Sequence, residues 1–370
     1  MNFDYWFRYF FKNGHLGFCI LIMESFLLHI GEINIESEYL KSIRLNKEII
    51  VGQKVAPELK ILKMEGSKII DPEIITIGNS RVNSFRANMF APYRFYNFSR
   101  VTTNFSHYLS IVKKFDNLKM VIVILEPFQF RKIEGQKKGP FRIKRKSRTI
   151  KQIVKNFYTI SKRDIFKLHE TPSFFGINGH LLNRGIRSLD GSVYAGKQHL
   201  KTNTDQEKKF AQYKSKNSSP TDKDMFQYLD SDINPRSLEL YRELVHYAEE
   251  KNITVVGITM PYAEEIQSTL NSNKKEFNLY HLLQTPNGQD QLRSVSEFYF
   301  NFSELEKLGS SNNEMIDRIH PSEKICARIL LKMMENKAFE KIIPKIDTQY
   351  IRHKIESTPL PLMDIFSQLK

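Results

Sequence analysis

The chain has 370 residues and a mass of 43.5 kDa, enough for one large α/β domain with insertions or for two smaller domains. Its 41% hydrophobic content allows a sizeable core and excludes a chain that is disordered throughout. The formal net charge of +15 indicates a surface that attracts polyanions such as nucleic acid, anionic lipid or acidic glycan. Two cysteines, Cys19 and Cys326, give no basis for a disulfide framework or a cysteine-based metal site.

The N-terminal region contains a mostly apolar run, HLGFCILIMESFLLHI, at residues 15–30. The run is short for a bilayer span of about 20 residues unless the aromatic residues before it are included, and Glu24 interrupts it. No small-x-small cleavage pattern follows. We therefore expect residues 1–32 to be a signal-anchor, with a buried amphipathic helix as the alternative. Because basic residues precede the run and acidic residues follow it, the N-terminus is expected in the cytoplasm and the remaining chain outside it.

Three strands are predicted by continuous β-branched runs at residues 73–77, 120–125 and 253–258, and a shorter candidate lies at 48–51. Continuous rather than alternating apolar runs are typical of parallel strands that are covered on both faces. Helical patterns at 104–115 and 235–250 precede the second and third strands, and Asn234 with Pro235 has the residue types of a helix start. This alternation predicts an α/β fold, a three-layer αβα sandwich with a mainly parallel sheet.

Residues 131–234 interrupt this pattern and are expected to form a basic, partly disordered insertion. Residues 131–151 are strongly basic, and residues 199–224 are polar enough to predict a mobile loop. The α/β domain is then expected in two parts, residues 33–130 and 235–340, followed by a C-terminal extension at 341–370.

A candidate nucleophile follows the first strong strand, in the segment Gly78-Asn79-Ser80-Arg81. Ligand chemistry in an open parallel sheet collects at the carboxyl ends of the strands. A glycine allows a sharp turn there, and a serine at the start of the next helix lies where backbone N–H groups favour an oxyanion. Taken alone, the same serine is more simply read as a helix cap.

A candidate base and its acid occur much later, as Asp317 and His320 before a predicted core helix at 324–334. Three residues apart, a carboxylate and an imidazole can lie on one side of a turn, so that Asp317 can fix the tautomer of His320. A serine hydroxyl needs such a base to become a nucleophile. The serine after the first strong strand and the Asp-x-x-His segment before the last core helix together favour a catalytic triad over a helix cap.

This order resembles the SGNH (GDSL-like) hydrolase superfamily, closest in style to its membrane-anchored bacterial members that O-acylate exported polymers. The resemblance covers about residues 70–335 and rests on the segments GNSR, YNFS at 96–99 and LEPF at 125–128, with Asp317 and His320. It implies Ser80 as nucleophile, His320 as general base and Asp317 as its orienting acid, on an SGNH/flavodoxin-like fold in the bacterial inner membrane with the catalytic domain outside the cytoplasm.

The oxyanion hole departs from that family pattern, which uses a glycine N–H in the second segment and an asparagine side chain in the third. This chain offers Asn97 and Ser99 in the second segment, and Glu126 with Gln129 in the third. Asn97, Ser99 and Glu126 are therefore the candidate oxyanion residues, and one missing donor typically costs about 10²–10³ in kcat.

The sequence therefore predicts a serine esterase or O-acyltransferase that acts on an ester or an acylated cell-envelope glycan, without cofactor or metal. No phosphate-binding loop, dinucleotide fingerprint or metal-ligand spacing is present. The alternative is an inactive, membrane-tethered protein that binds an anionic polymer or lipid through the basic insertion. We do not expect a nucleic-acid partner, because the basic run lacks a recognisable base-reading motif.

Overall fold

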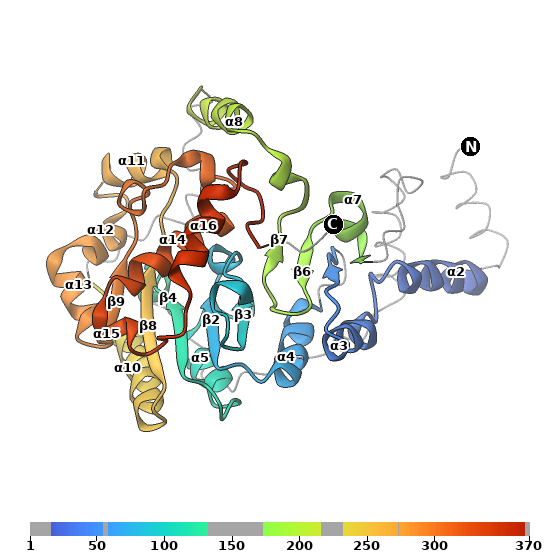
Figure 1. Cartoon of the computed structure of the whole chain (residues 1–370), viewed down its shortest axis with the longest axis horizontal. Coiled ribbons are helices and arrows are strands. Elements are labelled where there is room, and N and C mark those ends of the chain that lie inside the picture. Colours follow the sequence, from blue (N-terminus) through green and yellow to red (C-terminus); the bar gives the residue numbers. More distant parts are fainter. Residues whose placement is uncertain (1–15, 55–57, 132–172, 216–231, 273, 367–370) are drawn as a thin grey trace. The chain divides into compact units, whose positions relative to one another are not determined.

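The computed structural model describes residues 16–54, 58–131, 173–215, 232–272 and 274–366 (Figure 1). The chain divides into two compact units. The first comprises residues 1–66, 142–189 and 193–196, and the second comprises residues 67–141, 190–192 and 197–370. The basic run at 132–151 lies outside the described residues.

A five-stranded parallel sheet forms the centre of the second unit (Figure 1). The strand order is β3-β2-β4-β8-β9, with every neighbouring pair parallel. The strands are β2 (Ile74–Gly78), β3 (Phe95–Ser99), β4 (Met120–Ile124), β8 (Thr254–Thr259) and β9 (Phe298–Asn301). The carboxyl ends of all five strands therefore meet at one edge of the sheet, where a ligand site is expected.

The predicted strands at 73–77, 120–125 and 253–258 are confirmed as β2, β4 and β8. All residues of β2 and β4 are buried, as expected for strands covered on both faces. The sequence did not predict β3, which reads FYNFS, or β9, which reads FYFN.

Helices cover both faces of this sheet, so the second unit has three layers. On one face, α5 (Phe105–Val112) packs against α10 (Pro235–Glu250), and α10 packs on β8. On the other face, α14 (Glu323–Met334) shares an apolar core with the residues of β2, β4 and β8 that point toward it. Two shorter helices, α15 (Lys337–Glu340) and α16 (Thr348–Ser357), pack against α14. The α/β architecture expected from the sequence is confirmed at this level.

The remaining helices of the second unit are α8 (Asn203–Ser215), α11 (Glu264–Ser272), α12 (Asn278–Gln284) and α13 (Pro286–Arg293). Short 3₁₀ helices lie at Ser80–Val82, Ala87–Met89, Pro127–Phe130, Glu306–Leu308 and Asn312–Glu314, and a further one, Gly196–Leu200, begins at the last residue of the first unit.

The prediction of a loop at residues 199–224 is wrong for Asn203–Ser215, which form helix α8. Its start is capped reciprocally, since the Thr202 N–H donates to Asp205 Oδ2 (3.0 Å) and the Asp205 N–H donates to Thr202 Oγ1 (3.1 Å). Gln206 and Phe210 are buried one turn apart on the helix, so two buried side chains hold an otherwise polar segment. Residues 216–224 of the predicted loop lie outside the described residues.

The first unit contains a small mixed sheet of order β5-β1-β6-β7. Its strands are β1 (Ile50–Val51), β5 (Phe174–Phe175), β6 (Gly185–Arg187) and β7 (Val193–Tyr194), with helices α2 (Leu16–His29), α3 (Glu36–Arg44) and α7 (Ile177–Leu182). Helix α4 (Leu59–Ile70) runs from the first unit into the second. The N-terminal part of the predicted α/β domain thus clusters with part of the predicted insertion.

Within the described part of the chain, no helix has both the length and the apolar character needed to cross a membrane. Helix α2 covers most of the apolar run at 15–30, and residues 1–15 of the expected anchor lie outside the described residues.

Candidate active site

Ser80 lies two residues after the end of β2, at the first position of a 3₁₀ helix. The cap of this helix is Asn79, whose Oδ1 accepts the N–H of Arg81 at 2.9 Å. Because Asn79 takes the capping role, the Ser80 hydroxyl is available for other contacts. Gly78 is needed for close packing rather than for a left-handed backbone, since a Cβ there would lie 2.1 Å from the Cγ2 of Ile124.

His320 and Asp317 lie in the loop between the 3₁₀ helix at Asn312–Glu314 and α14. His320 Nε2 is 2.7 Å from Ser80 Oγ. His320 Nδ1 is 2.9 and 2.8 Å from the two carboxylate oxygens of Asp317. Residues 240 positions apart therefore form the hydrogen-bonded succession Ser80–His320–Asp317. This is the geometry in which an imidazole can accept the serine proton while a carboxylate holds the other nitrogen protonated.

The charge of Asp317 is stabilised by its surroundings. Burial raises the pKa of its carboxyl group, but the hydrogen bond and charge of His320 and the N–H groups of Ile319 and His320 outweigh that effect. The resulting pKa is about 2, below the usual 3.8. The N–H groups donate to Asp317 Oδ1 at 2.9 Å each, which also fixes the carboxylate in the turn. An ionised carboxylate is what orientation of the imidazole requires.

Helix α8 lies against the loop that carries these residues. Gln206 Nε2 donates to the carbonyls of Met315 (2.6 Å) and Asn313 (3.2 Å), and Lys209 Nζ donates to the carbonyl of Ile316. Burial lowers the pKa of Lys209, while the negative charge of Asp317 raises it in part. The helix that was predicted as a loop therefore supports the segment that leads to Asp317 and His320.

Arg81 connects the Ser80 turn to the His320 loop. Its Nε donates to the carbonyl of Ile319 (3.2 Å), and its Nη2 donates to the carbonyls of Met260 (2.7 Å) and Pro261 (2.8 Å). Its Nη1 donates to both carboxylate oxygens of Glu126, at 2.6 and 2.8 Å. The Arg81 side chain is buried. Its guanidinium therefore links three segments, those that follow β2, β4 and β8, and also contacts the residue before His320.

Tyr262 completes the surroundings of this guanidinium. Its ring centroid lies 3.6 Å from Arg81 Cζ, a cation–π contact, and its hydroxyl donates to Glu126 Oε2 at 3.0 Å. Because its carboxylate is paired with Arg81 and accepts from Tyr262, Glu126 is a structural counter-ion here. A carboxylate also has no proton to donate to an oxyanion, so the expected oxyanion role of the Glu126 side chain does not fit this geometry.

In the other two candidate oxyanion residues, the Asn97 side-chain amide and the Ser99 backbone N–H donate to groups inside the protein. Asn97 Nδ2 donates to the carbonyls of Val82 (2.7 Å) and Phe85 (3.0 Å), which uses both of its hydrogens. The Ser99 N–H donates to Asn97 Oδ1 at 2.8 Å. Both residues are buried in β3, where they fix the segment after Ser80.

One candidate oxyanion donor lies at Ser80 itself. Among the described residues, no hydrogen bond is seen from the Ser80 N–H, which lies at the first position of its 3₁₀ helix. Backbone N–H groups at such a position can donate to a developing negative charge. The Glu126 N–H does not supply a second donor, since it donates to Gln129 Oε1 at 2.7 Å.

No group of three or more His, Cys, Asp or Glu side chains among the described residues could hold a metal ion. Cys326 is buried in the core, and burial raises the pKa of its thiol well above the usual value. It therefore serves as a packing residue of α14.

No family model, curated protein or solved structure matches this chain.

The sequence pattern placed Arg81 beside Ser80 without predicting a role for it, and it did not predict that Tyr262 belongs to the site. Arg81 directly follows Ser80, and Tyr262 follows the carboxyl end of β8, so both positions carried a signal. What the sequence could not supply is that the two side chains stack on each other.

Proposed function

We propose that this protein is a serine esterase or O-acyltransferase of SGNH type that works through an acyl-Ser80 intermediate. The observation that carries the proposal is the hydrogen-bonded succession Ser80–His320–Asp317, with 2.7 Å between Ser80 Oγ and His320 Nε2. The proposal is also supported by the order of elements, a strand before Ser80 and a core helix after His320, which is the order that the sequence resemblance implies.

In the first step, His320 Nε2 takes the proton of the Ser80 hydroxyl as Oγ attacks the carbonyl carbon of an ester. The Ser80 N–H donates to the resulting oxyanion, and Asp317 stabilises the imidazolium. The imidazolium then returns its proton to the leaving alkoxide, and the ester bond breaks to give acyl-Ser80 and a free alcohol.

In the second step, His320 deprotonates either water or a hydroxyl group of an acceptor. Attack on acyl-Ser80 restores the serine and releases a carboxylic acid or a new ester. The substrate class that we propose is an ester or an acylated cell-envelope glycan, reached by a protein tethered through residues 1–32 and exposed outside the cytoplasm.

The second candidate function is an inactive, membrane-tethered protein that binds an anionic polymer or lipid. The specific observation in its favour is that Asn97 and Ser99 donate inward and that Glu126 is paired with Arg81. With these groups engaged elsewhere and the Ser80 N–H as the oxyanion donor, oxyanion stabilisation is weaker than in a complete hole.

Pre-steady-state hydrolysis of p-nitrophenyl acetate tests the proposal and separates its two branches. We expect a burst of p-nitrophenol followed by a slower steady rate, and a mass increase of one acetyl group on the peptide that contains Ser80. An acceptor alcohol that accelerates the steady rate and becomes acetylated indicates transfer; no effect of the alcohol indicates hydrolysis.

The control for this experiment is Ser106→Ala, which removes a half-buried hydroxyl near the start of α5. This variant should retain the burst, whereas Ser80→Ala should lose it. A burst of equal size in Ser80→Ala would contradict the proposal, and a folded native chain without burst or acetylated peptide would favour the binding protein.

A further inference from the structure

A second surface feature lies at the same edge of the sheet, outside the Ser80 site. A groove of about 750 Å³ is lined by residues of α11, α12 and α13 and by the end of β9 with the loop that follows it. Five side-chain amides contribute to the lining: Gln267, Asn271, Gln284, Gln289 and Asn301. A side-chain amide carries two N–H hydrogens and an acceptor oxygen, and a sugar hydroxyl both donates and accepts, so an amide group that is not engaged within the protein can pair with a sugar hydroxyl.

Hydrogen bonds within the groove hold several of these amides in place. Asn301 Nδ2 donates to Gln284 Oε1 at 2.7 Å, and Gln267 Nε2 donates to the Tyr280 hydroxyl at 2.7 Å. Gln289 Oε1 accepts from Arg293 Nη2 at 3.1 Å. Among the described residues, Gln284 Nε2 makes no hydrogen bond, so one donor in the lining of the groove remains unused. A preorganised set of amides loses little entropy when a ligand binds.

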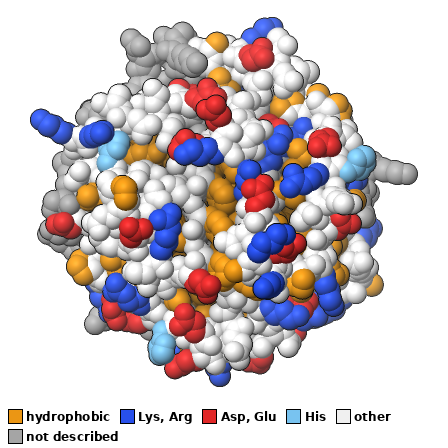
Figure 2. Space-filling model, turned by 60° about the vertical axis from the view of Figure 1, so that its left-hand side comes forward, with side chains coloured by type: hydrophobic (Ala, Val, Ile, Leu, Met, Phe, Trp, Pro, Cys, Tyr) orange, Lys and Arg blue, Asp and Glu red, His pale blue; other side chains and the backbone are white. Residues whose placement is uncertain are grey.

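The charges around the groove are paired. Arg293 Nη1 lies 3.0 Å from Asp290 Oδ1, and Lys307 Nζ lies 2.6 Å from Glu304 Oε1. Figure 2 views the side of the molecule that carries α11–α13, and on this face acidic and basic described side chains are intermixed. Since this face carries no extended patch of one sign, it favours an uncharged ligand over a polyanion.

The groove is linked to the active site through aromatic side chains. The Tyr280 ring centroid lies 6.4 Å from that of Tyr262, which stacks on Arg81 beside Ser80. In the sheet, β9 is three strands from β2, a separation on the order of 14 Å at the usual spacing of neighbouring strands. Only a ligand made of several units can occupy the groove and also reach Ser80.

We infer that this groove binds an uncharged, hydroxyl-rich oligosaccharide and thereby selects the acceptor or the acylated polymer. The part of the inference that concerns Ser80 rests on the proposed function, whereas binding in the groove does not.

Isothermal titration calorimetry of the full chain carrying Ser80→Ala tests binding without turnover. The probes are three neutral tetrasaccharides, cellotetraose, maltotetraose and chitotetraose, with tetragalacturonate and a capped Gly-Ser octapeptide for comparison. We expect at least one neutral tetrasaccharide to bind more tightly than tetragalacturonate and the peptide. Adding Gln284→Ala or Gln289→Ala should weaken that binding about threefold to tenfold, the loss expected for one hydrogen bond.

Gln291→Ala is the matched control, because Gln291 lies on α13 with Gln289 but does not line the groove. It should leave binding unchanged. The inference fails if no neutral tetrasaccharide binds, if the lining variants bind as well as the control, or if tetragalacturonate or the peptide binds best. If the inference fails in this way while the native chain still shows the acetyl burst, oligosaccharide binding in the groove is refuted. The proposed acyl-Ser80 chemistry is then unaffected.

Discussion

In the Gly-Asn-Ser turn, one residue caps the following helix and another contacts His320. Asn79 caps the short helix after β2, and the Ser80 hydroxyl lies 2.7 Å from His320 Nε2. The residues of this candidate triad could be proposed from the sequence because the serine follows the first strong strand and the Asp-x-x-His segment precedes the last core helix. The oxyanion residues could not, since whether an amide points toward a substrate or toward Val82 and Phe85 depends on packing.

Replacement of Arg81 tests whether it positions the reacting groups. Arg81→Lys keeps the charge but cannot make the same fork of hydrogen bonds to Glu126 and to the carbonyl of Ile319. We expect kcat for p-nitrophenyl acetate to fall about 10- to 100-fold with a small change in KM, because misplaced catalytic groups slow the chemical step.

Arg94→Lys is the control for that experiment, since Arg94 is half exposed and forms ion pairs with Asp71 and Glu73 at the start of the sheet. It should keep kcat within about twofold, the effect of a typical exposed ion pair. A loss of kcat that is equal in both variants, or a loss explained entirely by unfolding of Arg81→Lys, would contradict a positioning role.

The ionised state of Asp317 predicts a pH dependence of stability. Its folded pKa of about 2 is below the ordinary 3.8, so its contribution to stability is complete above about pH 5 and is lost as the pH falls through 2. The difference in unfolding free energy between the native chain and Asp317→Asn should therefore shrink between pH 5 and pH 2. Urea unfolding of both proteins over this range measures it, and a constant difference would show that the pKa is not depressed.

At the level of secondary structure, runs of β-branched residues were sufficient to predict β2, β4 and β8 but not the outer strands. Strands β3 (FYNFS) and β9 (FYFN) contain no β-branched residue, although their Phe and Tyr residues also favour strands. Their pairing with β2 and β8 is a tertiary contact. Helix α8 was missed for a related reason, because its polar sequence is held by a capping box and by contacts with the 313–316 segment. Local composition does not contain these tertiary contacts.

Gly257 in β8 gives a test of the packing between sheet and helices. A Cβ at this position would lie 2.7 Å from the Tyr241 hydroxyl and 2.9 Å from Leu125 Cδ1. Gly257→Ala should therefore destabilise the protein by about 1–3 kcal/mol, the usual cost of overpacking a core. The unfolding free energy from urea titration measures this change.

Gly17→Ala serves as the comparison, because Gly17 lies in helix α2 and nothing lies within 4 Å of a Cβ added there. This substitution should be neutral or stabilising by up to about 1 kcal/mol. If Gly257→Ala were also neutral, α10 would not pack on β8 as closely as described.

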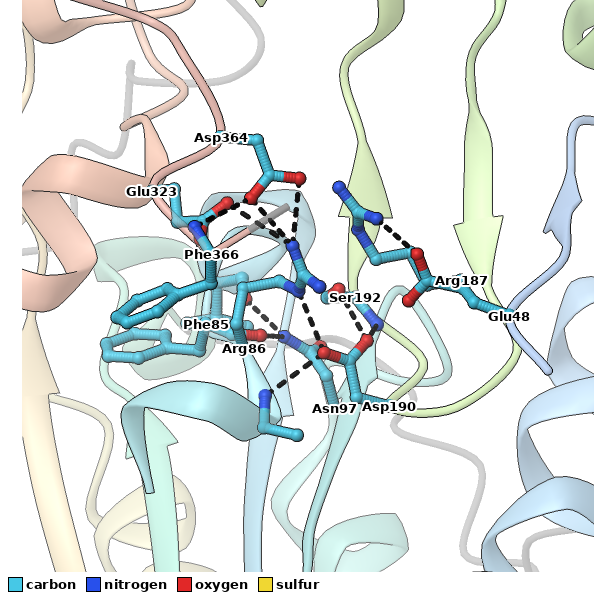
Figure 3. Close-up of polar contacts among 12 residues, drawn as sticks. Glu48, Phe85, Arg86, Asn97, Arg187, Asp190, Ser192, Glu323, Asp364 and Phe366 are labelled. Carbon is cyan, nitrogen blue, oxygen red and sulfur yellow. Dashed lines mark hydrogen bonds and ion pairs between the residues drawn. The ribbon is translucent and has the colours of Figure 1, made fainter. Parts of the chain in front are cut away.

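On the scale of the whole second unit, one buried arginine joins segments that are far apart in the sequence (Figure 3). Arg86 Nε lies 2.8 Å from Asp190 Oδ2, and its Nη1 lies 3.0 Å from Asp364 and 3.4 Å from Glu323. Glu323 is the first residue of α14, which follows the His320 loop, and Asp364 belongs to the C-terminal segment. These long-range ion pairs could not be read from the sequence, which shows charged residues but not their partners.

Loss of Arg86 should affect the unit as a whole. Arg86→Met removes the cation from three buried carboxylates, and breaking a buried ion pair from one side costs about 3–5 kcal/mol. Arg242→Met is the control, since Arg242 forms an exposed ion pair with Glu239 on α10. A free energy of unfolding that changes by less than 1 kcal/mol in Arg86→Met, within the range of exposed pairs, would show that the cluster does not hold the unit together.

The central claim, that Ser80 is a nucleophile activated by His320, is tested most directly by labelling with a fluorophosphonate serine probe. The native chain should be labelled in a time-dependent manner on the peptide that contains Ser80. Ser80→Ala should show no labelling, and His320→Ala should be labelled at least 100-fold more slowly, since loss of the base removes about 10²–10⁴ in rate. Absence of Ser80-dependent labelling in folded native protein, or equal labelling in His320→Ala, would contradict the account.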